Sequence, residues 1–257
     1  MSITRGEFLR SLGKSLPGMV ASTGVATAAQ AIFRRVAQAG PPDQPAGESK
    51  PAAPSIPFLH QGPAGSPAIA LTFDDGPVPG VTERILDALR ARGLRATFFM
   101  IGEKVAAAPD LASRVLHEGH ELGHHTYTHR KLTELSDAEV EAELDKTVAI
   151  FRQVLGRRAE WFRPPFGGLR QDQAARVRSR GMRVAMWSVD SEDWRGGSGE
   201  EVTERILTHV HPGAILLCHD VPATAQSIDT TLARLLEMQR YKLGTLSDLE
   251  RIQTASA

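Results

Sequence analysis

The sequence contains little of what marks several common classes of protein. Cys218 is the only cysteine in 257 residues, which excludes an intrachain disulfide and any metal site built from several cysteines. The 30 basic and 30 acidic side chains cancel, so the basic excess typical of nucleic-acid-binding and membrane-surface proteins is missing. With 41% hydrophobic residues, the composition indicates a soluble globular protein with one sizeable core. These totals favour a small or neutral binding partner over a nucleic acid.

A long, strongly apolar run is also missing. Residues 15–33 carry no charge, but Pro17, Gly18 and Gly24 interrupt them, so the segment would make a poor membrane-spanning helix. Three basic residues precede it and small residues near its end offer cleavage sites, as in an export signal. We therefore predict no stable membrane span, and export directed by residues 1–39 to the periplasm or the extracellular space. A disordered or amphipathic tail and a transit peptide are the alternatives.

A proline-rich stretch follows this segment. Half of the chain's 16 prolines lie between Gly40 and Pro67, where apolar periodicity is almost absent, and such a composition buries too little surface to fold. We predict a linker over residues 40–67 and a folded domain over residues 68–257. That domain is shorter than the roughly 250 residues of a complete eightfold β/α barrel.

Within the predicted domain, short apolar runs alternate with helical patterns. Ser136 to Glu139 form a capping box, and an apolar face from Val140 to Leu155 follows it and ends at Gly156. The predicted strands are residues 68–73, 96–101, 121–125, 160–163, 183–189 and 214–218, with residues 242–246 as a seventh. Regular alternation implies parallel strands joined by right-handed crossovers. The fold class we predict is α/β, a distorted and incomplete (β/α) barrel with about seven parallel strands.

Polar clusters follow five of these strands, where a β/α barrel carries its reactive groups. The clusters are residues 72–77, 125–129, 163–167, 190–194 and 217–220. The first contains Asp74 and Asp75, whose like charges repel unless a cation or separate partners hold them, although Asp-Gly-Pro is also ordinary turn chemistry. With His125 and His129, Asp75 makes a two-histidine, one-carboxylate set that leaves coordination positions open. This set suits a catalytic divalent ion, in a hydrolase or in a non-haem iron oxygenase.

Taken in order, the five clusters resemble the five motifs of the polysaccharide deacetylase family, which has a NodB-like domain and is also called carbohydrate esterase family 4. The resemblance extends from Thr72 to Asp220, most of the predicted domain. It implies a metal-dependent hydrolase that removes N-acetyl groups from the amino sugars of a polysaccharide or oligosaccharide and releases acetate. The implied partner is an N-acetylated glycan, and the implied cofactor is Zn²⁺ or else Co²⁺ or another divalent ion.

The resemblance also implies catalytic roles, position by position. Asp74 would be the general base, oriented by Arg163. His219 would be the general acid, held by Asp193. The implied metal ligands are Asp75, His125 and His129. Considered singly, Arg163 also suits a surface ion pair and His219 a core histidine.

The resemblance also implies substrate-binding residues, and the sequence departs from the family pattern at Phe166 and at His124. Trp194 and Leu217 would line a pocket for the acetyl methyl group, although a tryptophan alone also suits a core. The backbone amide near Phe166 would help to hold the oxyanion, with phenylalanine where tyrosine is common. His124 stands where the family often has asparagine, as a supporting group, an alternative ligand or an exposed residue. The histidines outside the motifs, which we expect on the surface, are His60, His117, His120, His209 and His211.

Other functions on the same fold stay open at this point. One is hydrolysis of a different non-peptide C–N amide bond, and another is carbohydrate binding without catalysis. The intact pair of Asp74 and His219 favours a hydrolase over a binding protein and over an oxygenase. The sequence carries no signal for one particular glycan or for an oligomeric state.

The export hypothesis predicts that residues 1–45, fused to a reporter enzyme, carry it out of the cytoplasm. Fractionation of cells followed by a reporter assay measures the outcome, and a reporter retained in the cytoplasm would contradict it. Gly6→Arg, which restores the second arginine of the twin-arginine-like segment Thr4 to Arg10, should increase export only if that route is used.

Overall fold

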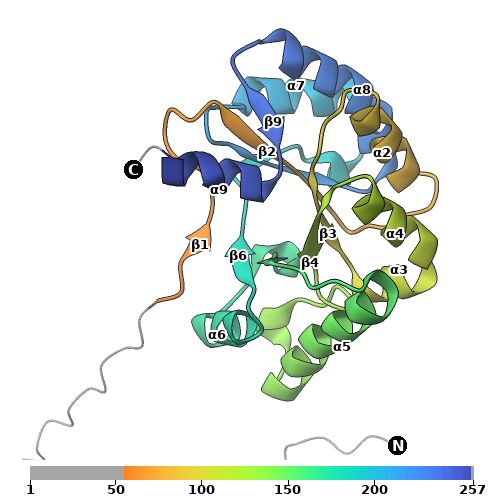
Figure 1. Cartoon of the computed structure of the whole chain (residues 1–257), viewed down its shortest axis with the longest axis vertical. Helices are drawn as coiled ribbons and strands as arrows, with labels where there is room; N and C mark the ends of the chain where they lie inside the picture. The colour runs from red at the N-terminus through yellow and green to blue at the C-terminus, as the bar shows by residue number, and fades with distance from the viewer. Residues whose placement is uncertain (1–54, 256–257) are drawn as a thin grey trace, which may run out of the picture. The chain divides into compact units, whose positions relative to one another are not determined.

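The computed structural model of the chain describes residues 55–255, and their side chains as far as residue 251 (Figure 1). The predicted export signal over residues 1–39 and the predicted linker as far as residue 54 lie outside this part. No helix within residues 55–255 has the combination of length and apolar character that crossing a bilayer requires.

A curled parallel sheet forms the centre of the described region. Its order is β1-β6-β5-β4-β3-β2-β8-β7, with β9 paired to β2, and every pairing is parallel. The strands are β1 (Phe58–Leu59), β2 (Ala68–Asp74), β3 (Thr97–Met100), β4 (Glu121–His124), β5 (Trp161–Phe162), β6 (Arg183–Ala185), β7 (Val189–Asp190), β8 (Ile215–His219) and β9 (Lys242–Gly244). The sheet is a half-barrel, which confirms the predicted α/β class and distorted barrel.

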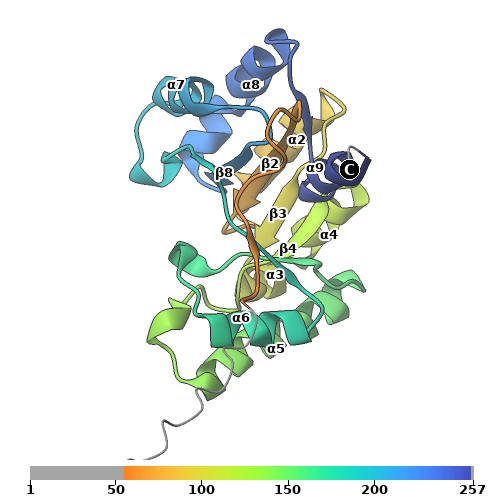
Figure 2. The ribbon, with the colours of Figure 1, turned by 90° about the vertical axis from the view of Figure 1, so that its left-hand side faces the viewer.

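Helices cover the outer face of this sheet (Figure 2). The longest begins where the sequence predicts: Ser136 Oγ accepts from the Glu139 amide, the Glu139 side chain accepts from the Ser136 amide, and Gly156 ends the helix at φ 62°. The α-helices are α2 (Thr82–Arg90), α3 (Gly102–Ala107), α4 (Pro109–His117), α5 (Asp137–Leu155), α6 (Gln171–Ser179), α7 (Gly199–His209), α8 (Pro222–Glu237) and α9 (Leu246–Ala255). Short 3₁₀ turns are η1 (Leu132–Glu134), η2 (Pro165–Gly167) and η3 (Asp193–Arg195).

The alternation of side chains along β2 positions the first catalytic candidate. Successive side chains of a strand point to opposite faces, and all seven residues of β2 are buried because helices and barrel interior cover both. Odd-numbered residues such as Phe73 join the core under the helices, whereas Ala68 and Ala70 join a separate cluster inside the curl. Asp74 ends this inner row.

One end of the barrel interior is closed by α9. Leu246 and Leu249 pack with Ala68 and Ala70 of β2 and with Trp161 of β5. Because these alanines lie at the amino end of β2, the apolar filling occupies that end, and polar residues are left to the carboxyl ends of the strands.

The strand predicted over residues 183–189 is wrong as a single element. It divides into β6, which pairs with β5 and β1, and β7, which pairs with β8 at the other edge of the sheet. Between them, the Met186 amide donates to Leu59 O (2.7 Å) and the Ser188 amide donates to Ile215 O (3.1 Å). The chain therefore crosses from one side of the half-barrel to the other, which a continuous strand cannot do.

The number of strands also differs from the prediction of about seven. Besides the divided strand, Phe58–Leu59 forms β1 inside the segment predicted as a linker, paired with Val184 and Ala185. The Gly62 amide continues the contact by donating to Gly213 O (2.7 Å). Two apolar residues among prolines are too short a run to show strand periodicity, so the sheet contact was not predicted.

Candidate active site

A cavity of about 390 Å³ lies at the carboxyl ends of the strands. Its wall contains eight of the ten predicted site residues, while Arg163 and Asp193 are buried behind it. The lining consists of Asp74, Asp75, His125, His129, Pro164, Phe166, Gly167, Trp187, Asp190, Trp194, Leu217 and His219. Residues from five separate clusters of the sequence thus meet in one cavity, as expected at the ends of parallel strands.

The three residues predicted as metal ligands point their ligand atoms at one another. Asp75 Oδ1 lies 3.4 Å from His125 Nε2 and 3.1 Å from His129 Nε2. All three ligand atoms lie within 4.8 Å of one another. Asp75 Oδ1 is buried and has no hydrogen-bond partner among the described residues, an arrangement that costs free energy unless a cation is coordinated.

The protonation of the two histidines also fits a metal site. His125 Nδ1 lies 2.7 Å from Arg163 O, and only a protonated Nδ1 can donate to a carbonyl, which leaves the Nε2 lone pair directed at Asp75. Burial lowers the pKa of His129, so the neutral imidazole that a metal ligand requires is favoured. The donor set therefore suits a divalent cation.

Two of these ligands occupy a strained backbone conformation. Asp75 has φ 70° and His129 has φ 61°, in the left-handed region that residues other than glycine rarely adopt. Lys104 Nζ holds the first of them by donating to Asp75 O at 2.7 Å. Such conformations persist only where surrounding contacts enforce them, and they concentrate at functional sites.

A buried ion pair fixes Asp74. Arg163 Nη1 donates to Asp74 Oδ1 at 2.7 Å, and the guanidinium is fully buried. Its other donors bind Thr72 Oγ1, Ala185 O and Met186 O, at 2.8, 3.2 and 2.8 Å. Burial lowers the pKa of Arg163, which the charge of Asp74 opposes. The ion pair of Arg163 is thus buried and does not lie on the surface. The second carboxylate oxygen, Asp74 Oδ2, lies beside the predicted metal ligands, 3.8 Å from His125 Nε2.

His219 stands on the neighbouring strand, opposite Asp74 in the register of β2 and β8. Its Nδ1 lies 2.6 Å from Asp193 Oδ1, and its backbone amide donates to Asp193 Oδ2 at 2.7 Å. Thr224 Oγ1 donates to the same Oδ2. Burial alone would lower the pKa of His219, but the hydrogen bond that its ring donates to Asp193 and the charge of Asp74 raise it to about 9. At neutral pH His219 is therefore an imidazolium that can donate a proton.

Aromatic and apolar side chains form the rest of the wall. Leu217 is buried, whereas Phe166 and Trp194 are 69% and 55% exposed, so Trp194 is no core aromatic. The sequence did not identify Trp187, which also lines the cavity, because it was placed inside the predicted strand 183–189. Its position just after β6, where that strand is interrupted, turns it toward the site.

Two histidines outside the site have structural roles. His124 is fully buried; its Nδ1 accepts from the Thr126 amide (3.1 Å) and its Nε2 bonds to Leu144 O (3.1 Å), so it is a supporting group and no ligand. His120, expected on the surface, is buried, which corrects that prediction. Its Nδ1 accepts from the Ala96 amide at 3.2 Å and so satisfies a donor that would otherwise be buried alone.

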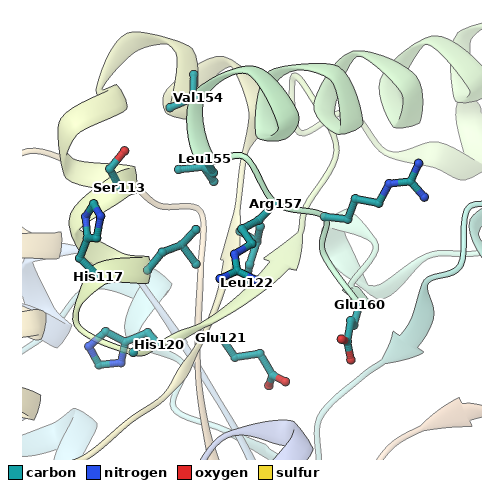
Figure 3. A pocket seen from close by; sticks show the side chains of 12 residues that line it. Ser113, His117, His120, Glu121, Leu122, Val154, Leu155, Arg157 and Glu160 are labelled. Carbon is teal, nitrogen blue, oxygen red and sulfur yellow. The ribbon is translucent and has the colours of Figure 1, made fainter.

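His120 lines a second, larger cavity of about 590 Å³ (Figure 3). This second cavity lies between α4, the end of α5 and the start of β4, and shares no lining residue with the first. Its polar residues, among them Ser113, His117 and Glu160, include no carboxylate close to two histidine nitrogens. The chemistry described above belongs to the smaller cavity.

Comparison with known proteins agrees with this geometry. Residues 61–207 match the family model described as polysaccharide deacetylase. The chain is 36% identical over 185 residues to peptidoglycan-N-acetylmuramic acid deacetylase PdaC of Bacillus subtilis, covering 72% of this chain and 39% of that protein. It is 41% identical over 189 residues to peptidoglycan-N-acetylglucosamine deacetylase PgdA of Listeria monocytogenes, covering 72% and 40%. The chain thus spans about two fifths of these curated relatives.

Solved structures show the same fold. The crystal structure of a CE4 family pseudoenzyme from Bacillus anthracis superimposes with a TM-score of 0.73 at 30% identity, covering 76% of this chain and 69% of that one. The structure of PdaC gives a TM-score of 0.70 at 35% identity, covering 76% and 93%. The fold is therefore shared by an enzyme and by a protein called a pseudoenzyme.

The contact between Asp193 and His219 predicts a change in proton affinity. Asp193→Asn removes the negative charge that stabilises the imidazolium, so the pKa of His219 should fall by about 1 to 3. An NMR titration of the histidine Cε1 protons, with His219 assigned from a His219→Gln variant, measures it. Asp190→Asn is the matched control, since Asp190 lines the same cavity without contacting His219. Equal shifts in the two variants would show that the direct contact does not tune His219.

Proposed function

Because the chain belongs to the polysaccharide deacetylase family, we propose that it hydrolyses N-acetyl groups on the amino sugars of a glycan and releases acetate. The observation that carries this proposal is the pairing of Asp74 and His219 on neighbouring strands beside a metal-ligand set. Amide hydrolysis needs one group that takes a proton from water and another that gives a proton to the departing amine. Both groups face the same cavity.

The roles of the two groups follow from their partners. Arg163 engages Oδ1 of Asp74 and orients the carboxylate, so Oδ2 is available to take a proton from the attacking water. The water oxygen adds to the amide carbon, and the C–N bond then breaks. Asp193 keeps His219 charged, so its Nε2–H protonates the departing nitrogen and the product leaves as a free amine.

Asp75, His125 and His129 would hold the divalent cation, for which we propose Zn²⁺, with Co²⁺ as a functional substitute. When bound, such an ion polarises the amide carbonyl and lowers the pKa of a coordinated water. Three protein ligands leave coordination positions open, which is the arrangement of a catalytic site and not of a closed structural one.

The apolar wall suits the rest of the substrate. Leu217 is buried in the wall and, with Trp194, offers a surface for the acetyl methyl group. Phe166 and Trp194 are exposed aromatic rings beside the cavity, the kind of surface on which sugar rings pack. The names of PdaC and PgdA point to peptidoglycan as the first glycan to test.

We also propose export of the protein, supported by the sequence of residues 1–39.

A pseudoenzyme on the same fold makes loss of catalysis the natural rival hypothesis. The described site argues for activity, because the base candidate, the acid candidate and all three ligands are present with their supporting partners. A non-haem iron oxygenase would share the ligands, but it has no use for a paired base and acid.

The direct experiment is an assay of acetate release from peptidoglycan and from chitin oligomers, before and after removal of metal with a chelator. Acetate release should stop on chelation and return with Zn²⁺ or Co²⁺. Oxygen consumption, recorded in parallel, should stay at background. Acetate release undiminished in metal-free protein would contradict the mechanism, and oxygen uptake without acetate would favour an oxygenase.

Substitutions of the two adjacent aspartates should differ in their effects on metal content and on turnover. Asp75→Ala removes a ligand, so the purified protein should contain little metal. Asp74→Asn keeps the ligand set and should retain the metal while turnover falls by about 100-fold or more, since the general base is lost. Metal analysis by mass spectrometry and the acetate assay measure both. If the two variants lost metal to the same extent, the division of roles between them would be wrong.

A further inference from the structure

The carboxylate of Glu143 accepts hydrogen bonds from the loop that joins the two predicted metal-ligand histidines. Glu143 lies on α5 and is 6% exposed. Its Oε2 accepts from the Tyr127 amide (2.9 Å) and the Thr128 amide (2.8 Å), and its Oε1 accepts from Thr128 Oγ1 (2.6 Å). All three donors belong to the residues between His125 and His129.

This carboxylate has no ion-pair partner among residues 55–251. Burying a charge without a counter-ion is costly unless hydrogen bonds replace the lost water, and here the loop supplies all of them. Glu143 also occupies the inward side of α5, between the buried residues Val140 and Leu144, where an apolar residue would be expected. A charge at this position calls for a role that an apolar side chain could not fill.

The loop needs such a restraint because its backbone is strained. Thr126 has φ 63° and His129 has φ 61°, both in the left-handed region. The His129 amide donates to Thr126 Oγ1 (3.1 Å), so one of these residues depends on the other. Glu143 satisfies the two amides that lie between them.

The two ligand histidines differ in how their rings are held. His125 is 2% exposed, and its Nδ1 is bonded to Arg163 O. His129 is 26% exposed in its side chain, and no described residue forms a hydrogen bond with its Nδ1. Besides the contact of its Nε2 with Asp75, its ring orientation therefore depends on the loop backbone and on the rings of Phe166 and His125, whose centroids lie 4.8 and 5.0 Å away.

We propose that Glu143 is a positioning residue that sets the direction of His129 and thereby the affinity and geometry of the metal site. The proposal builds on the function proposed above, because it concerns the same ligand set. In this arrangement the outer helix α5 determines how well the site coordinates a metal ion, through one carboxylate that does not touch the ion.

The test measures binding of Zn²⁺ alone, by competition with a chromophoric chelator, in the full-length parent and in Glu143→Gln. Glutamine has a similar shape but no charge, so its amide oxygen holds the two backbone amides more weakly, and its NH2 group can only donate to Thr128 Oγ1, whose hydroxyl must turn away. Affinity for Zn²⁺ should fall by about 10-fold to 100-fold, the range typical when a group supporting a metal ligand is replaced. The visible absorption spectrum of the Co²⁺ form should change as well, since it reports coordination geometry.

Glu141→Gln is the matched control, because it removes a carboxylate from the same helix that pairs with Arg176 and Arg180 and not with the loop. It should keep the parent's Zn²⁺ affinity and Co²⁺ spectrum. Thr128→Val, which removes one of the three bonds, should show a smaller loss in the same direction and decides the case if Glu143→Gln does not fold.

The proposal is overturned if Glu143→Gln binds Zn²⁺ as tightly as Glu141→Gln, or if Thr128→Val binds it as tightly as the parent. A parent protein that binds no Zn²⁺ would instead reject the metal site itself. The two failures are therefore distinguishable without a glycan substrate.

Discussion

The buried ion pair of Arg163 and Asp74 is the constraint on which the site depends. A guanidinium with no exposed surface needs an ionic partner and several acceptors, because removing one partner of a buried ion pair costs about 3 to 5 kcal/mol. Its partners come from β2, from the end of β6 and from Met186 just beyond it. The guanidinium of Arg163 thus ties three parts of the barrel interior together and fixes the carboxylate that we propose as the base.

The acceptors that the buried guanidinium of Arg163 needs are available because the sheet is interrupted. If residues 183–189 formed one strand, the carbonyl groups of Ala185 and Met186 would pair with a neighbouring strand. Because the chain crosses the half-barrel there, both carbonyls point to Arg163 instead. The guanidinium also lies 4.1 Å from the ring centroid of Phe99, so an aromatic face completes its surroundings. The interruption of the sheet and the orientation of the Asp74 carboxylate therefore share one structural origin.

The features that the sequence predicts well are those set by local chemistry. The capping box at Ser136 and the terminating Gly156 act within one helix, and the run from Ala68 to Phe73 is apolar enough to be a buried strand in any arrangement. The ends of the other strands then place the polar clusters together. The resemblance to a family also depends on local motifs, because each of the five motifs lies at the end of one strand.

Features that depend on distant partners were predicted poorly. The division between β6 and β7 depends on pairing with Leu59 and Ile215, and nothing within residues 183–189 marks it. His120 is buried where its Nδ1 accepts from the amide of Ala96, the residue just before β3. The role of Glu143 depends on a loop in the same way: its position beside the apolar face of α5 is visible in the sequence, but its partners, the amides of Tyr127 and Thr128, lie sixteen and fifteen positions earlier in the chain.

The pKa of His219 has a consequence for the charge balance of the site. In the mechanism proposed above, Asp74 gains one proton from water and His219 gives one to the departing nitrogen, so the site keeps its net charge while a proton changes residue. After each turnover Asp74 must lose a proton and His219 must regain one before the next substrate reacts. The raised pKa of His219 favours this reset, because the imidazole takes up a proton readily at neutral pH.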